Sequence, residues 1–222
     1  MEKRILWLLD HGHGQRQPGK RSPKFKDGSR FEEWRFNRTV VQHIESLACT
    51  AGLNVQVISP DAEFCGADIE ERAETANEAA EAHEGLSFGI SVHSNAAPME
   101  PGRGGWNYHA EGIETWTRHE DDLSKMIGLK FQRELVKMLK FKDRGIKSRP
   151  LQQFYLLQHC TMPLIFTETG FYTHPKQVRE LLKPEVQYRV ALAHLYAMLE
   201  IERYYAAPEW WAEMTSTNRR PL

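Results

Sequence analysis

The sequence predicts a single α/β domain in which a mostly parallel, twisted sheet carries helices on both faces. Apolar runs of strand length alternate along the chain with longer segments whose apolar residues recur every three or four positions. Such alternation favours parallel strands joined by crossover helices. The 222 residues are enough for one sizeable core, and we find no internal repeat or linker. We expect residues 1–205 to form the domain and residues 206–222 a short tail.

The chain opens with a predicted strand, a long loop and a helix. The apolar run from Ile5 to Leu9 has the length of a buried strand, and the glycines after it allow a sharp turn. Residues 15–32 are polar and rich in glycine and proline, which is typical of a loop. Gly52 is expected to end the helix that follows. The apolar face of that helix consists of Phe36, Val40, Ile44, Leu47 and Ala51.

The remaining elements continue the alternation. Asp68 is the expected N-cap of a helix that runs to about Glu84. Pro184 suits the first position of a final helix. The predicted strands lie over 55–58, 86–92, 113–117, 154–157 and 163–167, the further helices over 120–140 and 184–204, and a loop over 96–112.

Composition excludes several classes of protein. With 29 basic and 30 acidic residues the net charge is −1, so no global basic field for nucleic acid exists. No apolar run approaches the ~18 residues of a membrane span. The first apolar run ends at Asp10 and is too short for a secretory signal, so we expect synthesis in the cytoplasm without a signal peptide. The three cysteines, Cys49, Cys65 and Cys160, form no CxxC pair, and we interpret them as reduced packing residues.

Histidine and glutamate residues stand where predicted strands end and where the first helix begins. His13, His93 and Glu168 each follow a strand, at the edge where open α/β sheets bind ligands. Glu33 opens the first helix. Catalytic zinc commonly takes three imidazole or carboxylate ligands and keeps one position open. A carboxylate that is not a ligand is then needed to transfer protons. Two histidines and two glutamates match these needs, with His13 as the first ligand.

Each of these residues also has an ordinary structural explanation. The chain has ten histidines, and any one of them is more often a surface or packing residue than a ligand. Glu33 lies at a helix start, where the helix dipole favours acids. Glu168 alone is also compatible with a buried structural carboxylate, and no HExxH motif is present. The basic segment 16–30 is explained equally by a solvated loop and by a substrate groove.

Seven short motifs occur in one order along the chain. They are Asp10-His11-Gly12-His13-Gly14, Glu33 with Asn37, Arg72 with Asn77, Ser91-Val92-His93-Ser94-Asn95, Gly112-Ile113-Glu114-Thr115-Trp116, Arg144-Gly145-Ile146-Lys147, and Met162 to Phe171. In this order they resemble the motifs of zinc-dependent N-acetylmuramoyl-L-alanine amidases of the Amidase_3 type. The resemblance runs from about Ile5 to about Ile201.

The resemblance implies a role for each site residue. His13, Glu33 and His93 would hold one zinc ion per chain, and Glu168 would be the general base and acid. Residues 1–205 would be the catalytic domain. The implied substrate is peptidoglycan, cleaved at the amide between the lactyl group of N-acetylmuramic acid and L-alanine of the stem peptide.

Three positions depart from the family pattern. His11 replaces a proline, Gln15 replaces a common glycine, and His174 replaces a frequent asparagine. His11 and His174 are therefore alternative residues near the metal, although only His13 has the Gly-His-Gly context. The loop after His93 lacks the long inhibitory helix of some regulated members, so we expect an open active site.

The sequence shows neither a signal peptide nor wall-binding repeats. This pattern resembles a phage or prophage endolysin, a monomer that acts on the cell wall after holin-type release. An exported amidase cut to its catalytic domain would look the same. Two other functions stay open, a zinc carboxypeptidase or endopeptidase acting on stem peptides and a non-catalytic wall-binding protein.

Overall fold

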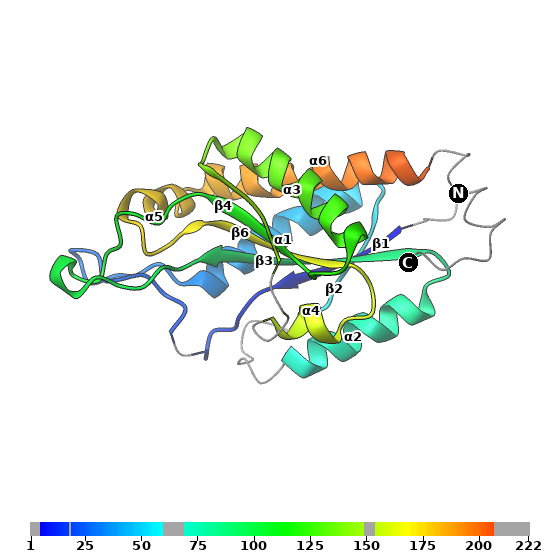
Figure 1. Ribbon diagram of the computed structural model, residues 1–222, viewed down its shortest axis with the longest axis horizontal. Coiled ribbons are helices and arrows are strands. Elements are labelled where there is room, and N and C mark those ends of the chain that lie inside the picture. Colours follow the sequence, from blue (N-terminus) through cyan, green and yellow to red (C-terminus); the bar gives the residue numbers. More distant parts are fainter. Residues whose placement is uncertain (1–4, 18, 60–68, 149–153, 207–222) are drawn as a thin grey trace.

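A six-stranded sheet forms the centre of the protein (Figure 1). The computed structural model describes residues 5–17, 19–59, 69–148 and 154–206. The strand order is β2 (Asn54–Val57), β1 (Ile5–His11), β3 (Leu86–Asn95), β6 (Leu164–Phe171), β4 (Ile113–Thr117) and β5 (Asp143–Ser148). The pairs along β2-β1-β3-β6 are parallel, whereas β4 is antiparallel to β6 and parallel to β5. The predicted single domain with a mostly parallel sheet is confirmed.

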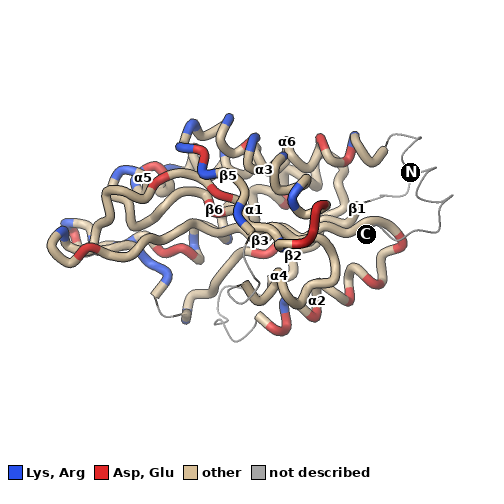
Figure 2. Tube along the Cα trace, in the orientation of Figure 1, with Lys and Arg blue, Asp and Glu red and all other residues tan. Residues whose placement is uncertain are grey.

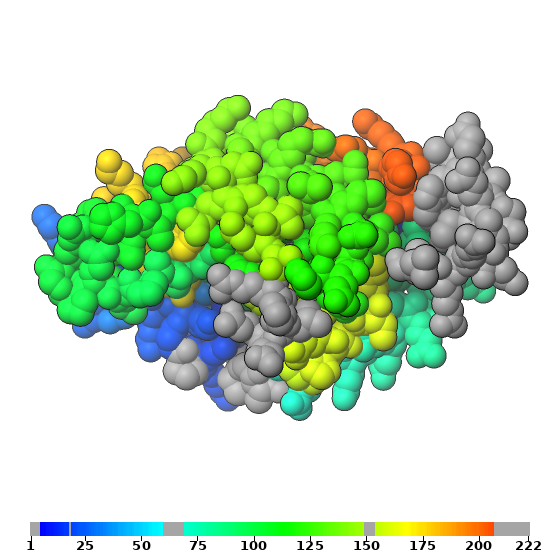
Figure 3. Space-filling view, viewed as in Figure 1, coloured from blue at the N-terminus to red at the C-terminus, as the bar shows by residue number. Residues whose placement is uncertain are grey.

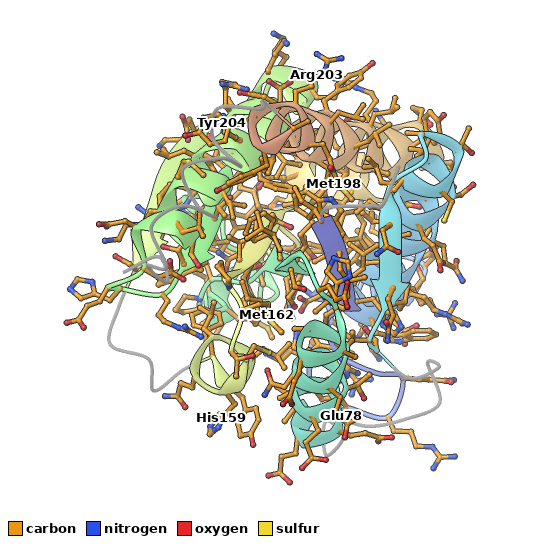
Figure 4. The ribbon with its side chains drawn as sticks, turned by 90° about the vertical axis from the view of Figure 1, so that its right-hand side faces the viewer. Glu78, His159, Met162, Met198, Arg203 and Tyr204 are labelled. Carbon is orange, nitrogen blue, oxygen red and sulfur yellow. The ribbon has the colours of Figure 1, made fainter. Side chains whose placement is uncertain are left out.

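Helices cover both faces of this sheet, as the sequence predicts. The helices on one face are α1 (Glu33–Thr50), α3 (Asp122–Leu139) and α6 (Pro184–Tyr205), and those on the other are α2 (Ile69–Ala82) and α4 (Tyr155–His159). Figure 4 shows the layers end-on, with Met198 of α6 above the sheet and Glu78 of α2 and His159 of α4 below it.

Strand β1 explains why the sheet needs both layers. All seven of its residues are buried. Ile5, Trp7 and Leu9 belong to the core under α1, α3 and α6, whereas Leu6 and Leu8 belong to the smaller core under α2 and α4. A strand buried on both faces is expected to be a continuous apolar run, which is the pattern that predicts it.

Two segments differ from the prediction. Residues 154–157 were expected to be a strand, but the chain forms the short helix α4 there, which buries Leu156 and Leu157. Strand β5 and helix α5 (Pro175–Leu181) were not predicted. β3 also runs beyond the expected Val92 to Asn95, so it carries His93 within the strand.

Several expectations concern residues outside those that the structure describes. These are the Asp68 cap, Cys65 and the tail from residue 207 onward. Cys49 is exposed and Cys160 is buried, and both are free thiols. In the part of the chain that the structure describes, no helix is long and apolar enough to cross a membrane.

Acidic and basic residues are unevenly distributed over the molecule, although its net charge is small. Figure 2 shows mainly acidic residues along α2, and basic residues among acidic ones on α3 and around α5. The basic side chains of the segment 16–30 are all exposed, namely Arg16, Lys20, Arg21, Lys24, Lys26 and Arg30. None of the six forms an ion pair with another residue that the structure describes. This segment therefore places positive charge on one side of the molecule.

Candidate active site

A cavity of about 380 Å³ lies at the carboxyl edge of the parallel strands. Its lining includes all four residues that the sequence predicts for the site, His13, Glu33, His93 and Glu168. Beyond the cavity, the loop 15–32 (blue) and the loop 96–112 (green) lie side by side in Figure 3, with the rings of Phe25 and Trp106 5.4 Å apart.

Two histidines and one glutamate converge within this cavity. His13 Nε2 lies 3.3 Å and His93 Nδ1 lies 3.1 Å from Glu33 Oε1. The three ligand atoms all lie within 4.8 Å of one another. They come from the turn after β1, the first turn of α1 and β3, so residues distant in sequence form one compact group.

The backbone around His13 is held in an uncommon conformation. His13 has a φ of 69°, in the left-handed region that non-glycine residues rarely adopt. Asn37 Nδ2 donates to the carbonyl of Gly12 at 2.8 Å, and Arg72 Nη2 donates to that of His13 at 3.3 Å. Such strained turns persist where the surroundings determine them, and they cluster at functional sites. Asn37 and Arg72, which the motifs singled out, therefore support the turn.

The electrostatics of the group suit a cation. Burial raises the pKa of Glu33, but the two imidazole rings outweigh it and bring the pKa to about 2, so the carboxylate is ionised. Burial lowers the pKa of His93 and favours its neutral ring. His13 Nδ1 lies 2.7 Å from Gln17 Oε1, and donating its hydrogen there would leave the Nε2 lone pair for a cation. Lone pairs that converge on one point fit a zinc ion, whose usual ligands are imidazole and carboxylate.

Glu168 lies next to this group without belonging to it. It pairs with His93 across β3 and β6 and with Glu114 across β6 and β4. Its Oε2 atom is buried and has no hydrogen-bond partner among the described residues. Burial, followed by the charges of Glu33 and Glu114, raises its pKa well above the usual range, with Lys20 opposing. A carboxyl group in this state is suited to exchange protons.

Glu114, on the neighbouring strand β4, has hydrogen-bond partners for both of its carboxylate oxygens. Its Oε1 accepts hydrogen bonds from Asn95 Nδ2 at 2.7 Å and from Trp116 Nε1 at 3.0 Å. Arg144 Nε donates to its Oε2 at 2.7 Å. The motifs containing these residues thus form a paired network, whereas Oε2 of the neighbouring Glu168 has no hydrogen-bond partner among the described residues.

The cavity lining also includes polar residues that the sequence did not assign to the site, and three of them bear on its chemistry. Gln17 orients His13 as described above, and Lys20 brings a positive charge near Glu168. Tyr172 is buried, and burial together with the charges of Glu33 and Glu168 raises the pKa of its phenol. No periodicity in the sequence marks these positions, although Lys20 belongs to the basic segment considered for a substrate groove.

The two extra histidines lie outside the converging group. His11 is buried at the end of β1, where its backbone N–H donates to Ser59 Oγ at 2.7 Å. Burial is the largest influence on the pKa of the His11 ring, and it lowers that pKa. His174 is the N-cap of α5, and its ring accepts a hydrogen bond from the Gln177 N–H and contacts the ring of Tyr108. His174 therefore has a structural role.

Comparisons with known proteins agree with the fold and with the family that the motifs indicate. The model of the Amidase_3 family, described as N-acetylmuramoyl-L-alanine amidase, matches residues 8–200. The crystal structure of an N-acetylmuramoyl-L-alanine amidase from Clostridium difficile 630 superposes with a TM-score of 0.74 and 25% identity, covering 93% of this chain and 99% of that one. The uncharacterised protein YqiI of Bacillus subtilis is 27% identical over 199 residues, 89% of this chain and 83% of its own. The B. subtilis amidase LytC is 26% identical over 175 residues, 78% of this chain but 31% of LytC.

Proposed function

Because the chain belongs to the N-acetylmuramoyl-L-alanine amidase family Amidase_3, we propose that it is a zinc-dependent peptidoglycan hydrolase. The bond cleaved is the amide between the lactyl group of N-acetylmuramic acid and L-alanine of the stem peptide. His13, Glu33 and His93 hold one zinc ion, and Glu168 is the general base and acid. The observation that carries this proposal is a set of three converging ligand atoms beside a buried carboxyl group whose Oε2 lacks a hydrogen-bond partner among the described residues.

The reaction divides between the metal and the chain. Bound zinc supplies a Lewis acid for the amide carbonyl and activates water at neutral pH. Glu168 accepts a proton from the attacking water and delivers it to the alanine nitrogen as the carbon–nitrogen bond breaks. Its raised pKa suits this double role, because the group must both take and release a proton. Products are an N-acetylmuramic acid carboxylate and a stem peptide with a free alanine amine.

Substitution of Glu168 by glutamine tests the assignment. Glu168→Gln should keep its zinc, because it leaves the three ligands intact, and should lose hydrolysis of purified sacculi by about 10²- to 10⁴-fold. Glu78→Gln on the exposed face of α2 is the matched control. Normal hydrolysis by Glu168→Gln would show that another residue transfers the protons, and a wild-type protein that is free of zinc and indifferent to chelators would end the proposal.

The products separate this function from its alternatives. Mass spectrometry of digests of defined muropeptides should find intact stem peptide with a free alanine amine and uncut glycan. Shortened stem peptides still joined to the sugar would identify a carboxypeptidase or endopeptidase. Binding to sacculi without any product would identify a non-catalytic wall-binding protein.

The role in bacterial lysis stays a prediction. We propose that the protein acts as an endolysin, a monomer that accumulates in the cytoplasm and reaches the wall after holin-type release. Expression in a bacterial host should then leave the cells intact until a permeabilising agent opens the membrane, after which turbidity falls. Cells that express Glu168→Gln should stay turbid after the same treatment, and lysis without the agent would contradict the role.

A further inference from the structure

A chain of buried hydrogen bonds lies behind His93. Its Nε2 atom, on the side of the ring away from Glu33, lies 3.0 Å from Ser91 Oγ. Ser91 in turn bonds to Asp10 Oδ2. Asp10 Oδ1 accepts from Arg72 Nη1 at 3.0 Å and from Ser59 Oγ at 2.8 Å. Asp10 and Ser91 are no more than 1% exposed, so water does not compete for these bonds.

The donors and acceptors along this series of hydrogen bonds indicate where each hydrogen lies. Arg72 Nη1 forms a buried ion pair with Asp10 Oδ1 at 3.0 Å, and the Ser59 hydroxyl donates to the same oxygen at 2.8 Å, so the carboxylate only accepts. The single hydroxyl hydrogen of Ser91 is therefore used on Asp10. Ser91 can then only accept from His93, which places a hydrogen on His93 Nε2.

The opposite nitrogen of the same ring faces the metal ligands. A neutral imidazole carries one N–H, so the hydrogen on Nε2 leaves a lone pair on Nδ1. Nδ1 lies 3.1 Å from Glu33 Oε1, and a cation bound to both atoms would use that lone pair. Histidines that bind metals commonly donate their second ring N–H to a fixed acceptor, which sets the tautomer and the orientation of the ring.

We infer that Asp10 and Ser91 are positioning residues, which fix His93 with its hydrogen on Nε2 and present Nδ1 to zinc. The inference rests on the proposed function, because it names the support of one proposed zinc ligand. Phe166 stacks on the His93 ring with centroids 5.1 Å apart, so the ring keeps its place when the serine hydroxyl is removed. The hydroxyl therefore acts on the tautomer more than on the location of the ring.

Ser91→Ala and Ser94→Ala form a matched pair. Both serines are buried and flank His93, but Ser94 Oγ has no hydrogen-bond partner among the described residues. Ser91→Ala should weaken zinc binding by about 10- to 100-fold in a competition titration with a chelator. Ser94→Ala should bind zinc as the wild type does, and Ser91→Thr, which restores a hydroxyl, should recover affinity.

Asp10→Asn tests the direction of the hydrogens. Arg72 and Ser59 both donate to Oδ1, so the asparagine should keep its oxygen there and turn Nδ2 towards Ser91. Ser91 would then accept from Asn and donate to His93 Nε2, which moves the ring hydrogen to Nδ1. Nitrogen-15 NMR of the ring in zinc-free protein, at a pH well above the ordinary histidine pKa, should show more hydrogen on Nε2 in the wild type and Ser94→Ala than in Ser91→Ala, and the least in Asp10→Asn.

The two measurements test the inference and the proposed metal site separately. Equal tautomer ratios and zinc affinities in Ser91→Ala and Ser94→Ala would overturn the inference whether or not the enzyme is an amidase. A wild-type protein that binds no zinc would overturn the proposed metal site, while the NMR spectrum would still decide whether Asp10 and Ser91 set the tautomer.

Discussion

Gly12 lies directly under the ring of His93. A Cβ atom at this position would lie 1.9 Å from His93 Cε1, far closer than two carbon atoms can approach. Gly12→Ala should therefore push the imidazole away from Glu33, weaken zinc binding and lower the free energy of unfolding by about 1–3 kcal/mol. Gly102→Ala is the control, because nothing lies within 4 Å of a Cβ there. Zinc titration and thermal unfolding of both variants measure the effect, and a Gly12→Ala protein with unchanged zinc affinity would contradict this packing.

Glu168 makes the zinc-free protein less stable as the pH rises. Its folded-state pKa lies well above the usual value, chiefly because of burial, so the folded protein holds this proton more tightly than the unfolded chain. Stability from this group is complete below the ordinary carboxyl pKa and is lost as the pH rises through the raised pKa. Each unit of pKa shift corresponds to about 1.4 kcal/mol.

Glu168→Gln mimics the protonated form and should remove this loss. With chelator present, its melting temperature should exceed that of the wild type at neutral pH, and the difference should vanish at a pH below the ordinary carboxyl pKa. Thermal melts across that pH range measure it. A difference that does not change with pH would mean that Glu168 has an ordinary pKa.

At the residue scale, the sequence predicted residues that the fold brings together in the candidate site, but not the contacts that support them. His13, Glu33, His93 and Glu168 stand at strand ends and a helix start, and the family motifs bring them to attention. The supports act through atoms that only the folded chain brings together, such as Gln17 Oε1 at 2.7 Å from His13 and the carbonyl of Gly12 under Asn37. Neither periodicity nor composition records such contacts.

At the element scale, helix α3 shows how a local signal sets a boundary. The side chain of Asp121 accepts a hydrogen bond from the Ser124 N–H at 2.9 Å and caps the helix. Asp121→Ala should cost about 1 kcal/mol of unfolding free energy. Asp122→Ala removes an acid one residue later that is exposed and pairs with Lys125, and should cost much less. Chemical denaturation of both variants compares them, and equal losses would mean that the cap contributes nothing beyond its charge.

The differences between prediction and structure also concern secondary-structure elements. The run Phe154 to Leu157 is short and apolar, a pattern that does not distinguish a strand from a buried helical turn. Asn77 binds the carbonyl of His159 and the N–H of Thr161, contacts that hold the end of α4 and come from a distant helix. Strand β5 is partly exposed and mostly polar at the edge of the sheet, so it lacks the apolar run that marks β1.

At the scale of the whole molecule, the proposed ligands tie together elements that are far apart in sequence. His13 follows β1, Glu33 begins α1 and His93 lies in β3. Without a cation, the ionised Glu33 faces the nitrogen atoms of two imidazole rings in a buried site. An ion that binds all three residues links the loop after the first strand to a helix and to the centre of the sheet, so its binding free energy adds to the stability of the whole fold.

Removal of zinc should therefore lower the melting temperature of the entire domain. A ligand at a hundredfold excess over its Kd stabilises the folded state by about 2.7 kcal/mol. For a domain of this size each kcal/mol corresponds to about 2–4 °C. Differential scanning calorimetry with added zinc and with excess chelator measures the change as a single cooperative transition. His13→Ala, which removes one ligand, should melt at nearly the same temperature under both conditions. An equal chelator-induced shift in His13→Ala would place the stabilising ion elsewhere in the protein, because the variant no longer offers the three converging ligands.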